Sequence, residues 1–207
     1  MLRRYEGVMR RFLGGCLLLF LGGCASPVLH VPEKPSQYAQ WQQDRVHAWR
    51  NHPEWAVHGR VLLQFSGRSH RAGFFWEKKL SGQSLSLNGA PGMGIFQIAE
   101  SAEGASLTHG REQIKAPTIN ALLRRQLGWE MDMDSLQKWI WGVVESPRHV
   151  AFDQAGQLAW IETEEWVLEY SDYRRVGKLI MPFRIDARNE SRKHRVLIKL
   201  NRWVLHD

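Results

Sequence analysis

Short segments in which apolar and polar residues alternate recur through most of the chain, and they constrain its fold more than any other feature. The segment 54–67, EWAVHGRVLLQFSG, has apolar side chains at most alternate positions, which is the period of a half-buried β-strand. Turn signals such as Ser66-Gly67 and Asn88-Gly89 separate such segments by only a few residues. Connections this short join antiparallel strands, because a parallel pair needs a long crossover. The sequence therefore predicts an antiparallel sheet.

We expect about five strands before a helical interruption and about five after it. The expected strands lie at 54–67, 70–79, 83–89, 95–100 and around Leu107, and then at 149–153, 157–163, 165–173, 181–187 and 194–205. A sheet with this many strands has to curl or to split into two.

Three segments have helical spacing instead. Residues 38–50 form the first, and Asn51-His52-Pro53 ends it. Residues 117–129 and 134–142 interrupt the strands, and the second of these opens with the spacing of a capping box, Asp134-Ser135-Leu136-Gln137. Helices that cover the mouth of a curled sheet enclose a cavity. The predicted fold class is therefore mainly β with α, a curled antiparallel sheet with helices as a lid over an apolar cavity.

Apolar side chains on the inward faces of these elements are the candidates for lining that cavity. The chain has ten tryptophans, whose large apolar rings suit both a packed core and a ligand cavity. Core packing is the simpler explanation for any single one of them. The cavity candidates are Val57, Val61, Leu63, Phe74, Trp76, Leu85, Leu87, Phe96, Ile98, Trp139, Ile140, Trp166, Leu168, Tyr170, Phe183 and Ile185.

Residues 1–23 are typical of a bacterial lipoprotein signal peptide. Four arginines precede an uncharged, mostly apolar run at 12–23, which is too short to cross a bilayer as a helix. The letters LGGC occur twice, ending at Cys16 and at Cys24, and both copies match the lipobox. Only the second copy follows an apolar stretch, so Cys24 is the expected lipidation site. Translation starts at Met1 or at Met9, and the sequence leaves both open.

The mature chain is expected to begin at Cys24. Residues 24–36 contain three prolines and are expected to form an extended, lipidated tether, and residues 37–207 a single domain. Ala25 stands where an aspartate would favour the inner membrane, so the expected location is the outer membrane. Because Cys24 is the only cysteine of the mature chain, no disulfide is expected.

The net charge of +7 excludes little by itself, because the signal segment contains four arginines and only one glutamate. The remaining excess lacks the dense basic stripe of a nucleic-acid-binding protein, so no nucleic-acid partner is expected. Residues 174–202 contain ten basic and two acidic side chains. They either meet anionic lipid or an acidic partner, or occupy solvated outward positions of strands.

Motifs for enzymatic chemistry are missing from the sequence. It contains no GxxxxGK[ST] and no HExxH, and the segment 82–86, GQSLS, lacks the second glycine of a nucleophile elbow. Ser84 in that segment is the nearest candidate nucleophile. We therefore expect a binding protein with no catalytic residue, no cofactor and no metal.

Several stretches together resemble the LolB family of outer-membrane lipoprotein receptors of Gram-negative bacteria. They are the lipobox, WAVHGRVLL, FFWEK, the hairpin before APGMG, LLRRQLGWEMDMDSLQKWIWG, WVLEYSDY, LIMPFRID and VLIKLNRWVL, and they span nearly all of the mature chain. The resemblance implies an unclosed antiparallel β-barrel. It also implies that the protein accepts acylated lipoproteins from the soluble carrier LolA and inserts them into the outer membrane without nucleotide hydrolysis. The implied partners are LolA, the acyl chains of its cargo and outer-membrane phospholipid, and we expect a monomer.

In that family a loop after an L-x-L strand carries an exposed leucine that is important for membrane insertion. Here the loop reads GAPGMGI at 89–95, and a gapless alignment places Pro91 where the leucine is expected. Met93 or Ile95 would supply the apolar tip instead. We favour Met93, because glycines flank it and methionine adapts to soft surfaces, although packing of Met93 into the core is the alternative.

Two other functions stay open at the level of sequence. One is a lipid- or small-molecule-binding envelope lipoprotein with no transfer role, which the same fold would serve. The other is an envelope hydrolase with an unrecognised site, for which Ser84 would be the nucleophile.

Overall fold

The computed structural model describes residues 31–32, 35–65, 67–89, 95–127 and 132–206. The strands are β1 (Val31–Pro32), β2 (Trp55–Phe65), β3 (Arg68–Lys79), β4 (Gly82–Asn88), β5 (Ile95–Ser101), β6 (Gly104–His109), β7 (Glu112–Ala116), β8 (His149–Phe152), β9 (Leu158–Glu162), β10 (Val167–Val176), β11 (Leu179–Asn189) and β12 (His194–Leu205). The helices are α1 (Pro35–Asn51), α2 (Ile119–Leu127) and α3 (Met133–Ile140).

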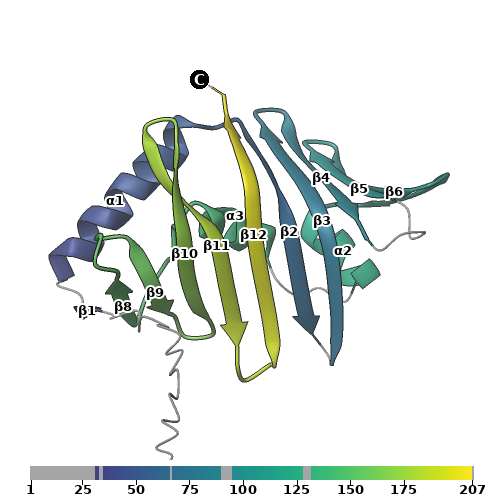
Figure 1. Ribbon diagram of the computed structural model, residues 1–207. Coiled ribbons are helices and arrows are strands. Elements are labelled where there is room, and N and C mark those ends of the chain that lie inside the picture. Colours follow the sequence, from purple (N-terminus) through teal and green to yellow (C-terminus); the bar gives the residue numbers. More distant parts are fainter. Residues whose placement is uncertain (1–30, 33–34, 66, 90–94, 128–131, 207) are drawn as a thin grey trace, which may run out of the picture.

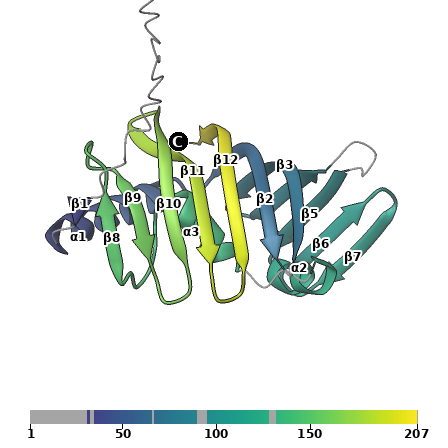
Figure 2. The same cartoon turned by 60° about the horizontal axis from the view of Figure 1, so that its bottom comes forward.

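These strands form one 12-stranded sheet in which neighbouring strands are antiparallel. Their order is β1-β8-β9-β10-β11-β12-β2-β3-β4-β5-β6-β7, so the last strand of the chain pairs with β2 in the middle of the sheet. β1 and β7 lie at opposite edges and do not pair with each other, which leaves the barrel open (Figure 1 and Figure 2). The predicted fold class is confirmed.

The alternation of apolar residues predicts ten of these strands, and the structure adds β1 and β7. Ile114 is the only large apolar residue of β7, so that strand shows too little alternation to be recognised. Trp166, which the sequence places within a strand, lies directly before β10.

The three helices are confirmed, but each begins elsewhere than expected, α2 at Ile119 instead of at residue 117. α1 begins at Pro35, since proline suits the first turn of a helix. α3 begins at Met133, and its N-cap is Asp132, whose Oδ2 accepts a hydrogen bond from the Ser135 N–H at 3.0 Å. The capping box expected at Asp134 is therefore wrong by two residues.

The end of α3 agrees with the expected glycine stop. Gly142 has a φ of +76°, which a residue without Cβ adopts freely. Its N–H donates to the Trp139 carbonyl, and the Val143 N–H donates to the Lys138 carbonyl, both at 2.9 Å. This Schellman motif turns the chain sharply and leads it toward β8.

Part of the segment expected as a tether has regular structure. Val31 and Pro32 pair with Phe152 and Ala151 at the edge of β8. With α1 beginning at Pro35, the described part of this segment belongs to the folded domain.

The apolar core lies between the sheet and the helices, on what we call the inner face of the sheet. A cluster of four tryptophans, Trp55, Trp76, Trp141 and Trp203, occupies part of it, with contacting ring centroids 5.1 to 6.4 Å apart. Each of the four is at most 6% exposed. Core packing is the explanation for Trp55, Trp141 and Trp203, whereas Trp76 also lines an apolar cavity beside this cluster.

Candidate ligand-binding cavity

A cavity of about 70 Å³ lies between the inner face of the sheet and the pair of helices α2 and α3, which we call the lid. Its wall is entirely apolar, because no polar atom contributes to its surface. The lining residues come from β2, β3, β4 and β12 on one side and from the lid on the other: Val61, Leu63, Phe74, Trp76, Leu85, Leu87, Val196, Ile198, Leu123, Met133, Leu136 and Ile140.

Seven sequence candidates line this cavity: Val61, Leu63, Phe74, Trp76, Leu85, Leu87 and Ile140. Sequence reasoning missed five other lining residues: Leu123, Met133, Leu136, Val196 and Ile198. A signal for two of them exists in the alternation of β12, because Val196 pairs with Leu63 and Ile198 with Val61. Directly paired residues of an antiparallel sheet lie on the same face.

The other nine candidates do not line the cavity. Val57 and Ile98 are buried in the core, and Phe96 stacks on His109 with the ring centroids 4.2 Å apart. Leu168, Tyr170, Phe183 and Ile185 are buried on β10 and β11 and take no part in the wall of this cavity. Trp139 and Trp166 line a second pocket.

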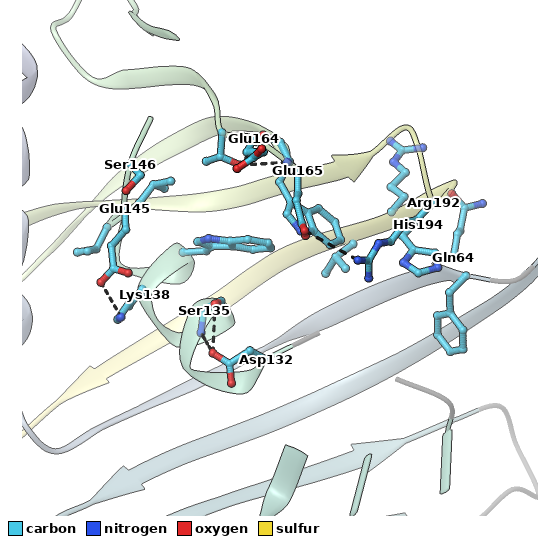
Figure 3. A pocket seen from close by; sticks show the side chains of 18 residues that line it. Gln64, Asp132, Ser135, Lys138, Glu145, Ser146, Glu164, Glu165, Arg192 and His194 are labelled. Carbon is cyan, nitrogen blue, oxygen red and sulfur yellow. Dashed lines mark hydrogen bonds and ion pairs between the residues drawn. The ribbon is translucent and has the colours of Figure 1, made fainter. Parts of the chain in front are cut away.

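This second pocket is larger, about 430 Å³ (Figure 3). We call it the polar pocket because, unlike the cavity, it has charged side chains in its wall beside the apolar ones. Lys138 and Glu145 lie on one of its sides, and Arg192 and His194 lie on another. Trp139 and Trp166 line it as an edge-on pair with ring centroids 5.2 Å apart. Sequence reasoning did not foresee this pocket.

Two polar contacts join the helices of the lid to each other. The Asn120 side chain of α2 donates to Asp132 Oδ1 at 2.5 Å and accepts from the Met133 N–H at 3.0 Å. Burial alone would raise the pKa of Asp132, but the hydrogen bonds from Ser135 and Asn120 outweigh it and lower this pKa. The carboxylate at the start of α3 is therefore ionised, and its negative charge interacts favourably with the helix dipole.

A chain of hydrogen bonds joins the lid to the wall of the cavity. Trp76 Nε1 donates to Gln83 Oε1 at 3.0 Å, and Gln83 Nε2 donates to Glu100 Oε2 at 2.8 Å. The other carboxylate oxygen of Glu100 accepts from the Ile119 N–H at 2.7 Å, in the first turn of α2. Glu100 thus holds the start of the lid against β5.

α1 covers the other half of the inner face and is held by its own set of bonds. The Tyr38 hydroxyl donates to the Val144 carbonyl at 2.7 Å, and Trp41 Nε1 donates to the Gly142 carbonyl at 3.4 Å. Both carbonyls belong to the segment after α3, so α1 also fixes the end of the lid.

Arg45 binds α1 to β11 from a buried position, at 7% exposure. Its guanidinium donates to the Ile180 carbonyl at 2.6 Å and contacts Met181 Sδ at 3.3 Å. The Trp41 ring lies 4.1 Å from the guanidinium carbon. Burial lowers the pKa of Arg45, whereas burial raises the pKa of Tyr170 and that of Tyr173, so the nearby phenols are neutral.

On the outer face of the sheet, part of the basic segment 174–202 surrounds one carboxylate. Asp186, at 2% exposure, accepts hydrogen bonds from Arg195 at 2.6 and 2.8 Å and from Arg188 and Arg184 at 3.4 Å. Burial alone would raise the pKa of Asp186, but these hydrogen bonds and charges lower it. Three of the basic residues of this segment are therefore engaged by a buried carboxylate within the protein.

The expected lipidation site and most of the expected insertion loop lie outside the part of the chain that the structure describes. Cys24, Pro91 and Met93 lie outside the residues that the structure describes. Ile95, the third candidate for the tip of the loop, is the first residue of β5 and is 57% exposed. Among the described residues, no group of three or more His, Cys, Asp or Glu is placed to bind a metal, and no described helix is long and apolar enough to cross a membrane.

The open barrel with a helical lid defines a structural class, that of LolA-like half-barrels. The chain is similar to a LolA superfamily protein from Nitrosomonas europaea, with a TM-score of 0.51 at 7% identity over 80% of this chain and 94% of that one. It is also similar to a DUF1329 family protein from Desulfovibrio piger, with a TM-score of 0.53 at 5% identity over 84% of this chain and 94% of that one. At such low identity, the likeness establishes the fold alone.

Sequence comparison narrows the class to a family. The model of the family described as "Outer membrane lipoprotein LolB" matches residues 53–203. The chain is 26% identical over 196 residues to the outer-membrane lipoprotein LolB of Stutzerimonas stutzeri, which covers 93% of this chain and 95% of that protein. It is also 26% identical over 203 residues to the protein of the same name from Pseudomonas paraeruginosa, over 92% and 95% of the two chains. The chain belongs to the LolB family.

Proposed function

We propose that this protein is an outer-membrane lipoprotein receptor, which accepts acylated lipoproteins from the periplasmic carrier LolA and inserts them into the outer membrane. The observation that carries the proposal is the wholly apolar cavity beneath the helical lid, in a chain of the LolB family. Such a wall favours hydrocarbon and leaves the polar atoms of a water-soluble ligand without partners.

The size of the cavity implies that the lid moves when a ligand binds. A volume of about 70 Å³ is small beside the roughly 300–1,000 Å³ of typical ligand pockets. An acyl chain therefore fits only when α2 and α3 shift away from β2, β3 and β4. Each CH₂ group transferred from water into the cavity contributes about 0.8 kcal/mol, which offsets the contacts that the lid loses.

Transfer by this mechanism needs no nucleotide. Acyl chains pass from the cavity of the carrier to the cavity of the receptor and then into the bilayer, and each environment removes them from water. A difference of about 1.4 kcal/mol between carrier and receptor gives a tenfold bias toward the receptor. Direct contact between the two cavities avoids the cost of exposing the chains between them.

The anchor and the insertion loop complete the proposal. Lipidated Cys24 would hold the receptor on the periplasmic side of the outer membrane, and Met93 would form the apolar tip of the loop before β5. Support for an apolar loop comes from Ile95, which is exposed at the start of that strand. Met93→Glu is expected to spare acceptance of cargo and to impair delivery. An equal loss of both steps would instead indicate that Met93 packs in the core.

The basic side chains of 174–202 that Asp186 does not engage are our candidates for docking the carrier. The electrostatic part of such docking weakens as salt screens the charges, over a Debye length of about 10 Å at 0.1 M. Handover that is insensitive to salt would rule out this docking surface, without affecting the proposed receptor function.

A transfer assay tests the proposed function. The mature protein is mixed with LolA that holds a radiolabelled lipoprotein, and vesicles of outer-membrane phospholipid are then added. We expect label to move to the receptor and then to the vesicles. A carrier that keeps its cargo would overturn the proposal. A protein that binds free fatty acid yet takes nothing from the carrier would be a lipid-binding lipoprotein without a transfer role.

Two adjacent residues of β4 provide a matched pair for that assay. Leu85 faces the cavity at 9% exposure, and Ser84 points to the opposite face of the strand. Leu85→Asp places a charge in the acyl site and should abolish acceptance, while Ser84→Asp should leave it unchanged. Ser84→Asp also tests the hydrolase alternative, because it removes the nearest candidate nucleophile.

A further inference from the structure

The polar pocket adjoins the apolar cavity, and the two share one residue. Val196 of β12 lines both of them. α3 also contributes to both, with Met133, Leu136 and Ile140 on the cavity and with Ser135, Lys138 and Trp139 on the pocket. A ligand whose apolar part lies in the cavity therefore finds a polar surface immediately beyond Val196.

The polar pocket offers charges of both signs in pairs. Lys138 Nζ lies 2.7 Å from Glu145 Oε1, and Arg192 lies 3.8 Å from Glu165 Oε1. Three of these four side chains are at least half exposed, and Lys138 is 28% exposed. Ion pairs this close to solvent contribute little to stability, so they exchange partners at low cost.

These groups match the chemistry of a peptide backbone. Carboxylates accept hydrogen bonds from backbone N–H groups, and ammonium and guanidinium groups donate to backbone carbonyls. The edge-on pair of Trp139 and Trp166 adds apolar surface that is indifferent to the identity of a side chain. The volume of about 430 Å³ is that of a small-ligand site and suits a few residues of extended chain.

From this arrangement we infer that the polar pocket binds the peptide segment that directly follows the acylated cysteine of a cargo lipoprotein, while the acyl chains occupy the adjoining cavity. The inference rests on the proposed receptor function and adds a second subsite to it. Recognition through the backbone serves cargo of varied sequence, because every lipoprotein has a backbone next to its acylated cysteine. A receptor with both subsites distinguishes a lipoprotein from a free fatty acid.

Photo-crosslinking in cells tests the inference on the full chain. The crosslinking residue p-benzoylphenylalanine replaces Lys138 in the polar pocket, Leu87 in the cavity wall, or Ser84 on the outer side of β4 as a control. We expect Leu87 to capture cargo acyl chains, Lys138 to capture the residues after the acylated cysteine, and Ser84 to capture neither. Mass spectrometry of the crosslinked products identifies the captured group.

Each other outcome has a separate meaning. If Leu87 captures acyl chains but Lys138 captures phospholipid or nothing, the peptide subsite is overturned and the receptor function stands. If Leu87 captures no cargo, the proposed function itself fails.

A variant that fills the pocket provides a second measurement. Ser135→Trp places a large ring in the pocket and keeps the backbone N–H that Asp132 caps. We expect acceptance of an intact lipoprotein to fall by about tenfold, equivalent to about 1.4 kcal/mol, and binding of palmitate to change by less than about twofold. Equal losses for both ligands, with the fold intact by circular dichroism, would contradict a separate peptide subsite.

Discussion

One sheet carries two different covers on its inner face. α1 lies over the half made by β8 to β11, which we call the filled half because Leu168, Met181 and Ile185 are completely buried there. The helices of the lid contact β5, β6, β7 and β11. Together with β2, β3, β4 and β12 they enclose the apolar cavity of what we call the hollow half, beside which Val61 and Leu63 are only half-buried. The filled half and the hollow half are built from the same alternation of residues, so the difference between them comes from the helices.

The way in which the helices are held also differs between the two covers. α1 reaches the sheet through Arg45 and the segment after α3 through Tyr38 and Trp41. The hydrogen bonds of the lid run mainly between α2 and α3, with Glu100 as a link to the sheet. A cover that is bonded to itself more than to the sheet is suited to move as a unit.

Shortening a core leucine in each half should give the largest contrast. Leu168→Ala, in the filled half, should lower the free energy of unfolding by about 4 kcal/mol, because it opens a new cavity in tightly packed surroundings. Leu85→Ala enlarges a cavity that already exists and should cost about 2 kcal/mol. Urea unfolding of both variants measures the difference.

For acceptance of cargo, Leu85→Ala should have a larger effect than Leu168→Ala, which is the reverse of their order in unfolding free energy. Leu85→Ala alters the acyl site and changes acceptance, whereas Leu168→Ala changes only stability. Equal unfolding energies for the two variants would mean that the two halves are packed alike.

The filled half should also depend on the ion cluster on its outer face. Asp186→Asn removes the charge that three arginines share and should lower the free energy of unfolding by about 3 kcal/mol at pH 7. Because the pKa of Asp186 is lower in the folded state than in the unfolded one, its contribution is present above about pH 4 and is lost as pH falls further.

Unfolding curves at pH 7 and pH 3 test whether the stabilisation by Asp186 is lost on acidification. The stability gap between wild type and Asp186→Asn should narrow at pH 3. Glu164→Gln, at an exposed ion pair, serves as the control and should change stability by less than about 1 kcal/mol. A gap that widens on acidification would contradict the lowered pKa of Asp186.

Arg45 tests how α1 is held. Arg45→Ala removes a buried charged donor from the Ile180 carbonyl and should destabilise the protein by about 2 kcal/mol. Hydrogen exchange should become faster in α1 and in β11, with little change in α2. Arg50→Ala, at an exposed position of the same helix, should have a negligible effect. Equal effects of the two substitutions would show that the bond to β11 does not hold the helix.

Sequence periodicity predicts which residues point inward but not which of them meet a void. Leu85 and Leu168 both follow the alternation, but only Leu85 lies beside the cavity under the lid. Val196 was missed because the alternation of β12 was not extended to its partners in β2. The capping residue of α3 was missed because Asp132 and Asp134 both suit the role, and only the backbone geometry distinguishes them.

The polar pocket could not be predicted from the sequence at all. Its residues come from four segments that are far apart in the chain, at 64–65, 132–146, 163–166 and 192–196. Its charged residues share no local sequence pattern. The order of the strands in the sheet and the position of α3 bring them together. Periodicity along one strand or helix detects faces, whereas this pocket is a product of tertiary packing.

The smallest change in the free energy of unfolding is expected at Glu100, which links the lid to the sheet. Glu100→Gln replaces the charged acceptor at the start of α2 with a neutral amide and should cost about 1 kcal/mol. Since α2 and α3 stay joined through Asn120, the loss should favour movement of the whole lid over fraying of one helix. Hydrogen exchange should therefore accelerate in both lid helices while α1 is unchanged, and acyl chains should enter faster.

Glu103→Gln, in the exposed turn after β5, is the matched control. Faster exchange confined to α2 would show that the two helices do not move as a unit, and the hollow half would then open by local unfolding.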